Sequence, residues 1–263
     1  MDTAEVGGLR IAYERAGRGP CVVLLHGFVG GAKGTWARQI AALSDEFTVV
    51  AWDAPGSSRS TDPPESFRMP EYADCLASFI TALGLRTPHV VGLSFGGALA
   101  LELYRRHRAV PRTLVLAGAY AGWAGSLARE VVDDRLELSL RLSELPGDEF
   151  AASMVPSMFS ESAPAEAVAA FRAAVSELNS VGFRVMTRAL AEADLRDVLP
   201  EIIVPTLLLY GDEDARAPLD VAEAIHRAVP ASKLVVMPGV GHVSSVEAPE
   251  QFTDEVRQFL RAH

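Results

Sequence analysis

Cysteine is scarce in this chain, with only Cys21 and Cys75 among 263 residues. That number excludes the disulfide framework that stabilises many small secreted domains. Cys21 falls in an apolar, strand-like run and Cys75 in a helical pattern, so we expect two buried free thiols. Positive charge is also in short supply, since 24 Lys and Arg residues stand against 34 Asp and Glu residues and leave a net charge of -10. Because no basic cluster offsets this balance, we expect no binding to nucleic acid or to an anionic membrane surface.

Long apolar runs and targeting signals are absent as well. No apolar stretch reaches the roughly 18–20 residues that are needed to span a bilayer. The N-terminal segment 1–5 has no basic region followed by an apolar one, so we predict no secretory signal and expect a soluble, cytoplasmic protein. What the chain does contain is 49% hydrophobic and 22% charged residues, as in ordinary globular proteins. Its length fits one large α/β domain with an insertion, or two small domains.

Strand-like segments alternate with helical ones over most of the chain, which predicts βαβ units and a mostly parallel sheet. The first strand is expected at the sheet edge. Thr35 is a candidate cap for a helix that runs through Leu43, and Pro70 suits the first turn of a helix that ends near Gly84. The predicted strands are 9–14, 21–25, 47–52, 89–93, 113–117, 204–210 and 233–237.

The alternation stops between residues 122 and 193, where the pattern is helical throughout. The predicted helices there are 127–145, 149–158, 165–178 and 182–193. A helical block inside an α/β alternation indicates an inserted cap. We therefore predict a core formed by residues 1–121 and 194–263, and a helical cap, or lid, formed by residues 122–193.

The most informative motif is the pentapeptide around Ser94, Gly-Leu-Ser-Phe-Gly at 92–96. It lies between a predicted strand and a predicted helix, which is the setting of a nucleophile elbow. A serine hydroxyl is a poor nucleophile at neutral pH, so it needs a base and a carboxylate that orients the base. In this architecture the order along the chain should be serine, acid, histidine. Ser94 is therefore the predicted nucleophile.

The later strands end in residues that can complete a triad, because active-site groups of open α/β sheets lie at the carboxyl ends of strands. His242 follows the last strand and is the predicted base. His26 also ends a strand, and we expect it to hold the neighbouring loop, with a role as base as the alternative. The acid is predicted to be Asp214, and the alternatives are Asp212 and Glu213 in the same turn.

Two backbone N–H groups should stabilise the oxyanion that forms when a serine attacks a carbonyl. One is expected from Phe95, directly after the nucleophile, and the other from Phe28, in a glycine-rich loop after the strand at 21–25. For the substrate pocket, the predicted residues are Trp123, Met154, Met158 and Phe159, and the alternative for this apolar stripe is ordinary packing.

With these motifs in this order, the chain resembles the α/β-hydrolase superfamily over nearly its whole length. The segments that carry the resemblance are His26-Gly27-Phe28, 53–60, 92–97, Val204-Pro205-Thr206 leading to 211–214, and Gly241-His242. The turn at 53–60 is usually Asp-x-Pro-Gly-x-Gly-x-Ser in this superfamily, and Ser58 replaces its second glycine. The resemblance implies an α/β-hydrolase fold with the acid at Asp214 and the base at His242.

The pattern is most similar to the small bacterial esterase, lactonase and cofactor-free haloperoxidase group. It implies a serine hydrolase that cleaves a small, largely apolar ester or lactone, with no cofactor and no metal. Two alternatives remain: a carbon–carbon bond hydrolase that acts on a diketone-type substrate, and a ligand sensor with slow hydrolase activity. The expected partner is a small-molecule substrate, and the chain is expected to be a monomer or a homodimer.

Overall fold

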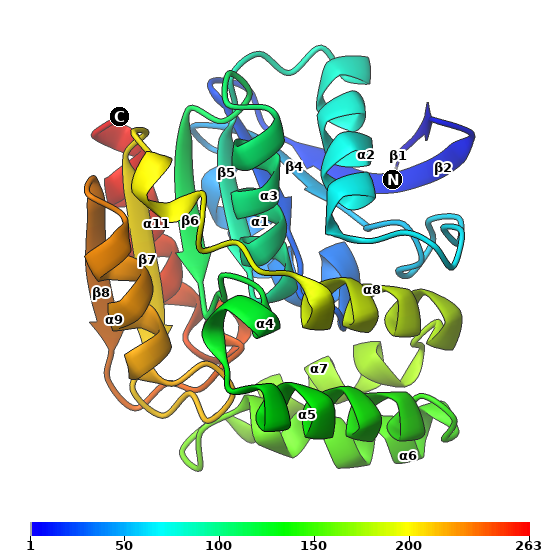
Figure 1. Ribbon diagram of the computed structural model, residues 1–263. Coiled ribbons are helices and arrows are strands. Elements are labelled where there is room, and N and C mark those ends of the chain that lie inside the picture. Colours follow the sequence, from blue (N-terminus) through cyan, green and yellow to red (C-terminus); the bar gives the residue numbers. More distant parts are fainter. Residues whose placement is uncertain (1) are drawn as a thin grey trace.

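The computed structural model describes residues 2–263. Its centre is an eight-stranded sheet in the order β1-β2-β4-β3-β5-β6-β7-β8, in which only the β1–β2 and β2–β4 pairs are antiparallel. Helices cover both faces, with α2 and α3 in front of the sheet and α1 and α11 behind it in Figure 1. The strands are β1 (Asp2–Val6), β2 (Leu9–Ala16), β3 (Cys21–Leu25), β4 (Thr48–Trp52), β5 (His89–Leu93), β6 (Thr113–Ala117), β7 (Thr206–Gly211) and β8 (Ser232–Met237). This is the predicted α/β-hydrolase fold.

The strands at the centre of the sheet form because nearly all of their residues, after the first, are apolar. Strands β4, β5 and β6 are buried at every position, as expected for parallel strands that are covered on both faces. The predicted bounds of β3, β5 and β6 agree with the structure at both ends.

The edge of the sheet differs from the prediction. The segment at 9–14 is not the edge strand, because β1 pairs with β2 and takes that place. The β1–β2 hairpin turns at Gly7 and Gly8, whose φ angles of +56° and +83° suit a tight two-residue turn. The sequence pattern missed β1 because its residues are mostly polar and exposed.

The core helices follow the predicted order. They are α1 (Gly31–Leu43), α2 (Met69–Ala82), α3 (Phe95–Arg106), α9 (Leu219–Ala228), α10 (Ser244–Glu247) and α11 (Pro249–Arg261), with a short 3-10 turn η2 (Leu199–Glu201). Helix α2 has its proline in the first turn, as predicted. Helix α1 begins at Gly31, so Thr35 lies inside it and the prediction that Thr35 caps the helix is wrong. Cys75 is buried, whereas Cys21 is only half-buried, and both are free thiols.

The segment between β6 and β7 is helical, as the break in alternation predicted. It contains α4 (Trp123–Ser126), α5 (Arg129–Leu142), α6 (Gly147–Met154), the 3-10 turn η1 (Val155–Met158), α7 (Ala165–Ser176) and α8 (Ser180–Glu192). These helices gather at one end of the sheet (Figure 1), the end at which β5 delivers Ser94. In the range 2–263, no helix combines the length and the apolar character that crossing a membrane requires.

Candidate active site

Ser94 occupies a strained turn between β5 and α3. Its φ of 54° and ψ of -113° place a non-glycine residue in a region that side chains disfavour. The turn is held by the Ser94 N–H, which donates to the Ala117 carbonyl at the end of β6 at 2.8 Å. The side chain is nearly buried, with 3% exposure. This is the geometry that the strand–turn–helix context predicts for a nucleophile elbow.

The glycines on either side of Ser94 are required by close backbone approach. A Cβ added at Gly92 would lie 2.2 Å from the Gly96 carbonyl oxygen. A Cβ added at Gly96 would lie 2.2 Å from the carbonyl oxygen of Leu25, at the end of β3. Any side chain at these positions would push the elbow away from the neighbouring strand or from its own helix.

His242 and Asp214 form a buried hydrogen-bonded pair beside the elbow. His242 Nδ1 lies 2.8 Å from Asp214 Oδ2, and both side chains are at most 4% exposed. The other carboxylate oxygen, Oδ1, accepts from the N–H groups of Arg216 and Ala217, each at 2.8 Å. The carboxylate is therefore fixed from both sides and can orient the imidazole.

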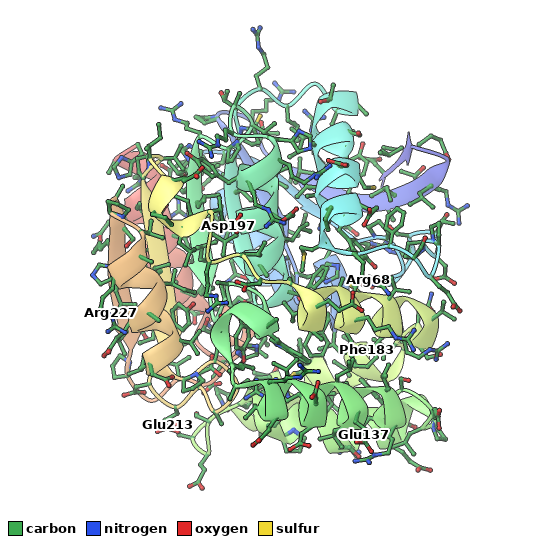
Figure 2. All side chains as sticks on the ribbon, viewed as in Figure 1. Arg68, Glu137, Phe183, Asp197, Glu213 and Arg227 are labelled. Carbon is green, nitrogen blue, oxygen red and sulfur yellow. The ribbon has the colours of Figure 1, made fainter. Side chains whose placement is uncertain are left out.

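The neighbouring acids in the turn have other surroundings. Asp212 Oδ1 accepts from the Gly239 N–H at 2.6 Å and so closes the loop rather than facing His242. Glu213 is exposed at the molecular surface (Figure 2). Of the three candidates for the acid, only Asp214 contacts the imidazole.

Gly118 makes room for this pair at the end of β6. A Cβ at Gly118 would lie 3.1 Å from His242 Nδ1 and 3.2 Å from Asp214 Oδ2, and its φ is +48°. Residues 117–120 contain no carboxylate, and position 118 has no space for one.

The loop after β3 is hydrogen-bonded through His26 to the segment that follows β4. The His26 Nε2 atom accepts from the Ala54 N–H at 3.0 Å, and Nδ1 contacts the Gly27 carbonyl oxygen. Burial lowers the pKa of His26, an effect partly offset by the nearby Asp53 carboxylate, so the ring stays neutral. With both nitrogens engaged, His26 has the structural role expected for it. Gly27 brings the loop close, since its Cβ would lie 3.7 Å from that of Ser94.

The acid loop has its own anchor on the inserted segment. The Tyr120 hydroxyl donates to the Arg216 carbonyl oxygen. Arg135 of α5 donates to the Tyr120 hydroxyl oxygen at 3.0 Å and to the Arg216 carbonyl oxygen at 3.1 Å. The Arg216 guanidinium lies over the ring of Phe28, 5.6 Å from its centroid. Burial raises the pKa of Tyr120 to about 12, so the hydroxyl keeps its proton. The sequence analysis missed Arg216, although it stands only two residues after the predicted acid.

Ser94 and His242 line one small cavity of about 10 Å³, which is room for about one water molecule. The other walls are mostly apolar. They are Gly27, Phe28, Val29, Leu93, Met158, Phe171 and Val243. The site is therefore small and mostly apolar around the two polar side chains.

The predicted pocket residues fall into two groups. Met158 lines the cavity, whereas Trp123, Met154 and Phe159 are not among its walls. Trp123 packs edge-on against Phe28 with ring centroids 6.3 Å apart, and Met154 contacts Arg216. Figure 2 labels Phe183 on α8, which packs against Phe28 at 5.3 Å. The ring of Phe95 points into the core, where it packs on Tyr72.

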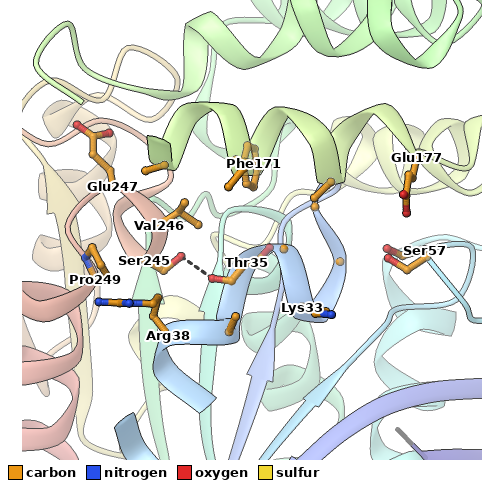
Figure 3. A pocket seen from close by; sticks show the side chains of 18 of the residues that line it. Lys33, Thr35, Arg38, Ser57, Phe171, Glu177, Ser245, Val246, Glu247 and Pro249 are labelled. Carbon is orange, nitrogen blue, oxygen red and sulfur yellow. Dashed lines mark hydrogen bonds between the residues drawn. The ribbon is translucent and has the colours of Figure 1, made fainter. Parts of the chain in front are cut away.

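A larger groove of about 830 Å³ runs beside the cavity, between α1 and α7 (Figure 3). Phe171 of α7 lines both spaces and separates them. Its ring lies close above Gly30, where an added Cβ would be 2.8 Å from the ring. The sequence analysis missed Phe171 because nothing in a helical pattern tells which apolar residue faces a site. No cluster of three or more His, Cys, Asp or Glu side chains suited to a metal ion occurs within residues 2–263.

Comparison with known proteins places the chain in a family. Residues 22–255 match the model of the alpha/beta hydrolase family. The match covers most of the sequence, so the chain belongs to this family, as its motifs indicated.

Solved structures and curated relatives agree with that assignment. A thermophilic esterase from Thermogutta terrifontis, solved with malate bound, is 30% identical and superposes with a TM-score of 0.92 over 100% of this chain and 99% of its own. The enol-lactonase from Burkholderia xenovorans LB400 is 25% identical, with a TM-score of 0.87 over 99% and 100% of the two chains. A putative carbamate hydrolase, RutD, from Cronobacter turicensis is 30% identical over 93% of this chain and 92% of its own.

Proposed function

We propose that this protein is a serine hydrolase that cleaves a small, largely apolar carboxylic ester or lactone through an acyl-enzyme. The observation that carries the proposal is the buried His242–Asp214 pair at 2.8 Å, whose imidazole lines one cavity together with Ser94 in its strained turn. The apolar walls of that cavity favour a neutral acyl or alcohol group. The similarity to an esterase and an enol-lactonase supports the same reaction class.

In the proposed first half-reaction, Ser94 Oγ attacks the substrate carbonyl carbon while His242 Nε2 takes the hydroxyl proton. The imidazolium that forms keeps its Nδ1–H bond to Asp214, which stabilises the positive charge. The backbone N–H groups of Phe28 and Phe95 donate to the oxyanion. When the tetrahedral intermediate collapses, the leaving alcohol takes the proton from His242 and Ser94 retains the acyl group.

The second half-reaction reverses the roles with water. His242 takes a proton from a water molecule, whose oxygen attacks the acyl carbon. Collapse of this second intermediate releases the carboxylic acid, and the proton returns to Ser94 Oγ. In this proposal the helices between β6 and β7 act as a cap over residues that all come from the core.

The nucleophile can be tested by covalent labelling. A fluorophosphonate should modify the protein once, at Ser94, and Ser94→Ala should abolish both labelling and hydrolysis of p-nitrophenyl acetate. We expect a loss on the order of 10³-fold or more, because nucleophile and base act as a unit. Labelling at another residue, or full activity of Ser94→Ala, would contradict the proposal. A single stoichiometric burst without turnover would instead favour the ligand-sensor alternative, and cleavage of a diketone but not of esters would favour the carbon–carbon hydrolase.

A further inference from the structure

The loop that carries His242 is linked to the inserted segment on both sides of the histidine, directly on one side and through Glu247 on the other. On one side, the Val243 N–H donates to the Met158 carbonyl oxygen at 3.1 Å. On the other side, the Gly241 N–H donates to Glu247 Oε2 at 3.1 Å. Glu247 in turn binds Ser160 of the inserted segment. Residues 158–160 thus contact the His242 loop in two ways. Met158 bonds to it directly, and Ser160 is linked to it through the carboxylate of Glu247.

Glu247 is a buried carboxylate, 6% exposed, at the end of α10 (Figure 3). It accepts from the Ser160 hydroxyl, and each of its oxygens lies 3.3 Å from the Ser160 N–H. The hydrogen bonds from Ser160 and Gly241 therefore compensate the burial of this carboxyl group.

The two segments that Glu247 joins are also in direct contact. A Cβ at Gly241 would lie 2.6 Å from the Ser160 nitrogen and 2.7 Å from the Phe159 carbonyl carbon. The two backbones are therefore in close contact at Gly241. The same short stretch includes Met158, a wall of the cavity that contains Ser94.

We propose that Glu247 is a positioning residue, which fastens segment 158–160 to the His242 loop so that closure of the cap sets the position of the imidazole. This inference rests on the proposed function. The cavity beside Ser94 has about 10 Å³ of free space, less than an acyl group fills, so we expect its walls to move when substrate enters. Because Met158 is one of those walls, its displacement also displaces the two neighbours of His242. Val243 is bonded to Met158, and Gly241 is linked to the same segment through Glu247. The base then reaches its working position only after segment 158–160 has returned over the substrate.

The test compares Ser160→Ala, Glu247→Gln and Glu247→Ala, with Ser162→Ala as the matched control. The Ser162 hydroxyl contacts that of Ser160 and the Gly239 carbonyl oxygen but is not bonded to Glu247. With p-nitrophenyl acetate we expect kcat to fall about 10-fold in Ser160→Ala and about 100-fold in Glu247→Ala, since misplacement by about 1 Å costs that much. The kcat of Glu247→Gln, which keeps one acceptor oxygen, should lie between the values of those two variants. The kcat of Ser162→Ala should match that of the unsubstituted protein.

Three further readouts separate positioning from a general loss of structure. KM should change less than twofold, the rate of fluorophosphonate labelling at Ser94 should fall with kcat, and Ser160→Ala should have little further effect in the Glu247→Ala background. Unchanged kcat in both Ser160→Ala and Glu247→Gln would overturn the inference, and so would an equal fall in Ser162→Ala. If Glu247→Ala does not fold, the other two variants decide. Absence of Ser94-dependent turnover in the unsubstituted protein would instead refute the proposed function.

Discussion

Two aspartates that stand two residues apart in one turn have different surroundings. Asp214 is buried against His242, and two backbone N–H groups hold its second oxygen, whereas Asp212 accepts a hydrogen bond that closes the turn to Gly239. The carboxylate that contacts the imidazole is the one that can fix its tautomer and stabilise its charged form.

Asp214→Asn should therefore lower kcat with p-nitrophenyl acetate by about 10³- to 10⁴-fold, because an amide cannot stabilise the imidazolium and presents the wrong hydrogen-bonding partner. Asp212→Asn, the matched control, should change kcat less than about threefold, because an amide oxygen can still accept from Gly239. Steady-state kinetics of both variants at neutral pH measure the contrast. Were Asp212→Asn the more damaging, the acid would have been placed two residues too late.

At this scale the sequence predicts the residues that belong to motifs and misses those brought in from elsewhere. Ser94 and His242 could be predicted because strand ends and chain order restrict the candidates to a few. Phe171 and Glu247 could not, because their importance depends on contacts with residues that are distant in the sequence. The spacing of Glu247 five residues after His242 was the available signal, and it has meaning only once the buried carboxylate is seen to bind Gly241 and Ser160.

Among the elements, buried strands were the most predictable part of the fold. Continuous apolar runs such as β3 and β5 admit few other arrangements in a chain of this length, and their bounds agree with the structure. Strand β1 was missed because a polar edge strand is formed by hydrogen bonding to its hairpin partner rather than by burial. In the inserted segment the helices were predicted, but which face of each helix meets the site depends on packing between elements.

Helix α7 and the turn η1 supply the walls that we expect to control substrate choice. Phe171→Ala should join the small cavity to the groove of about 830 Å³, and Met158→Ala should widen the cavity itself. The ratio of kcat/KM for p-nitrophenyl octanoate to that for the acetate should rise about 10-fold or more, since apolar contacts provide discrimination of this size.

The control for that comparison is Leu138→Ala, which removes an exposed apolar side chain from α5 of the same inserted segment. It should leave the ratio unchanged. Trp123→Ala should have a smaller effect than Met158→Ala, because Trp123 acts on the cavity only through Phe28. A flat substrate profile in both Phe171→Ala and Met158→Ala would show that neither side chain limits access to Ser94.

For the whole molecule, the pH dependence of stability is governed in part by a histidine far from the site. His89 is buried at the start of β5, where it hydrogen-bonds Thr113 at 2.9 Å. Burial, together with the nearby positive charge of Arg112 and His263, lowers the pKa of His89 to about 4. In the unfolded chain the value is about 6.5, so the unfolded state binds the proton first as the pH falls.

The free energy of unfolding should therefore decrease as the pH is lowered from about 6.5 to about 4, by roughly 2–3 kcal/mol from this group. Urea denaturation at pH 7.5 and pH 4.5 should show a smaller difference for His89→Gln than for the unsubstituted protein. His226→Gln, at an exposed position, serves as the control and should leave the difference as it is. Equal acid sensitivity of His89→Gln and the unsubstituted protein would contradict this assignment.

The position of the inserted helices also has a consequence for how the chain is made. Strand β6 pairs with β5 before it and with β7 after it, but residues 118–205 separate the end of β6 from the start of β7. At a synthesis rate of about 5–20 residues per second, the ribosome needs on the order of 4–20 s to deliver the missing partner. During that interval a fully apolar strand presents an open edge, to which a second nascent chain could add. The inserted helical segment thus lengthens the time in which the sheet is incomplete and most prone to aggregate.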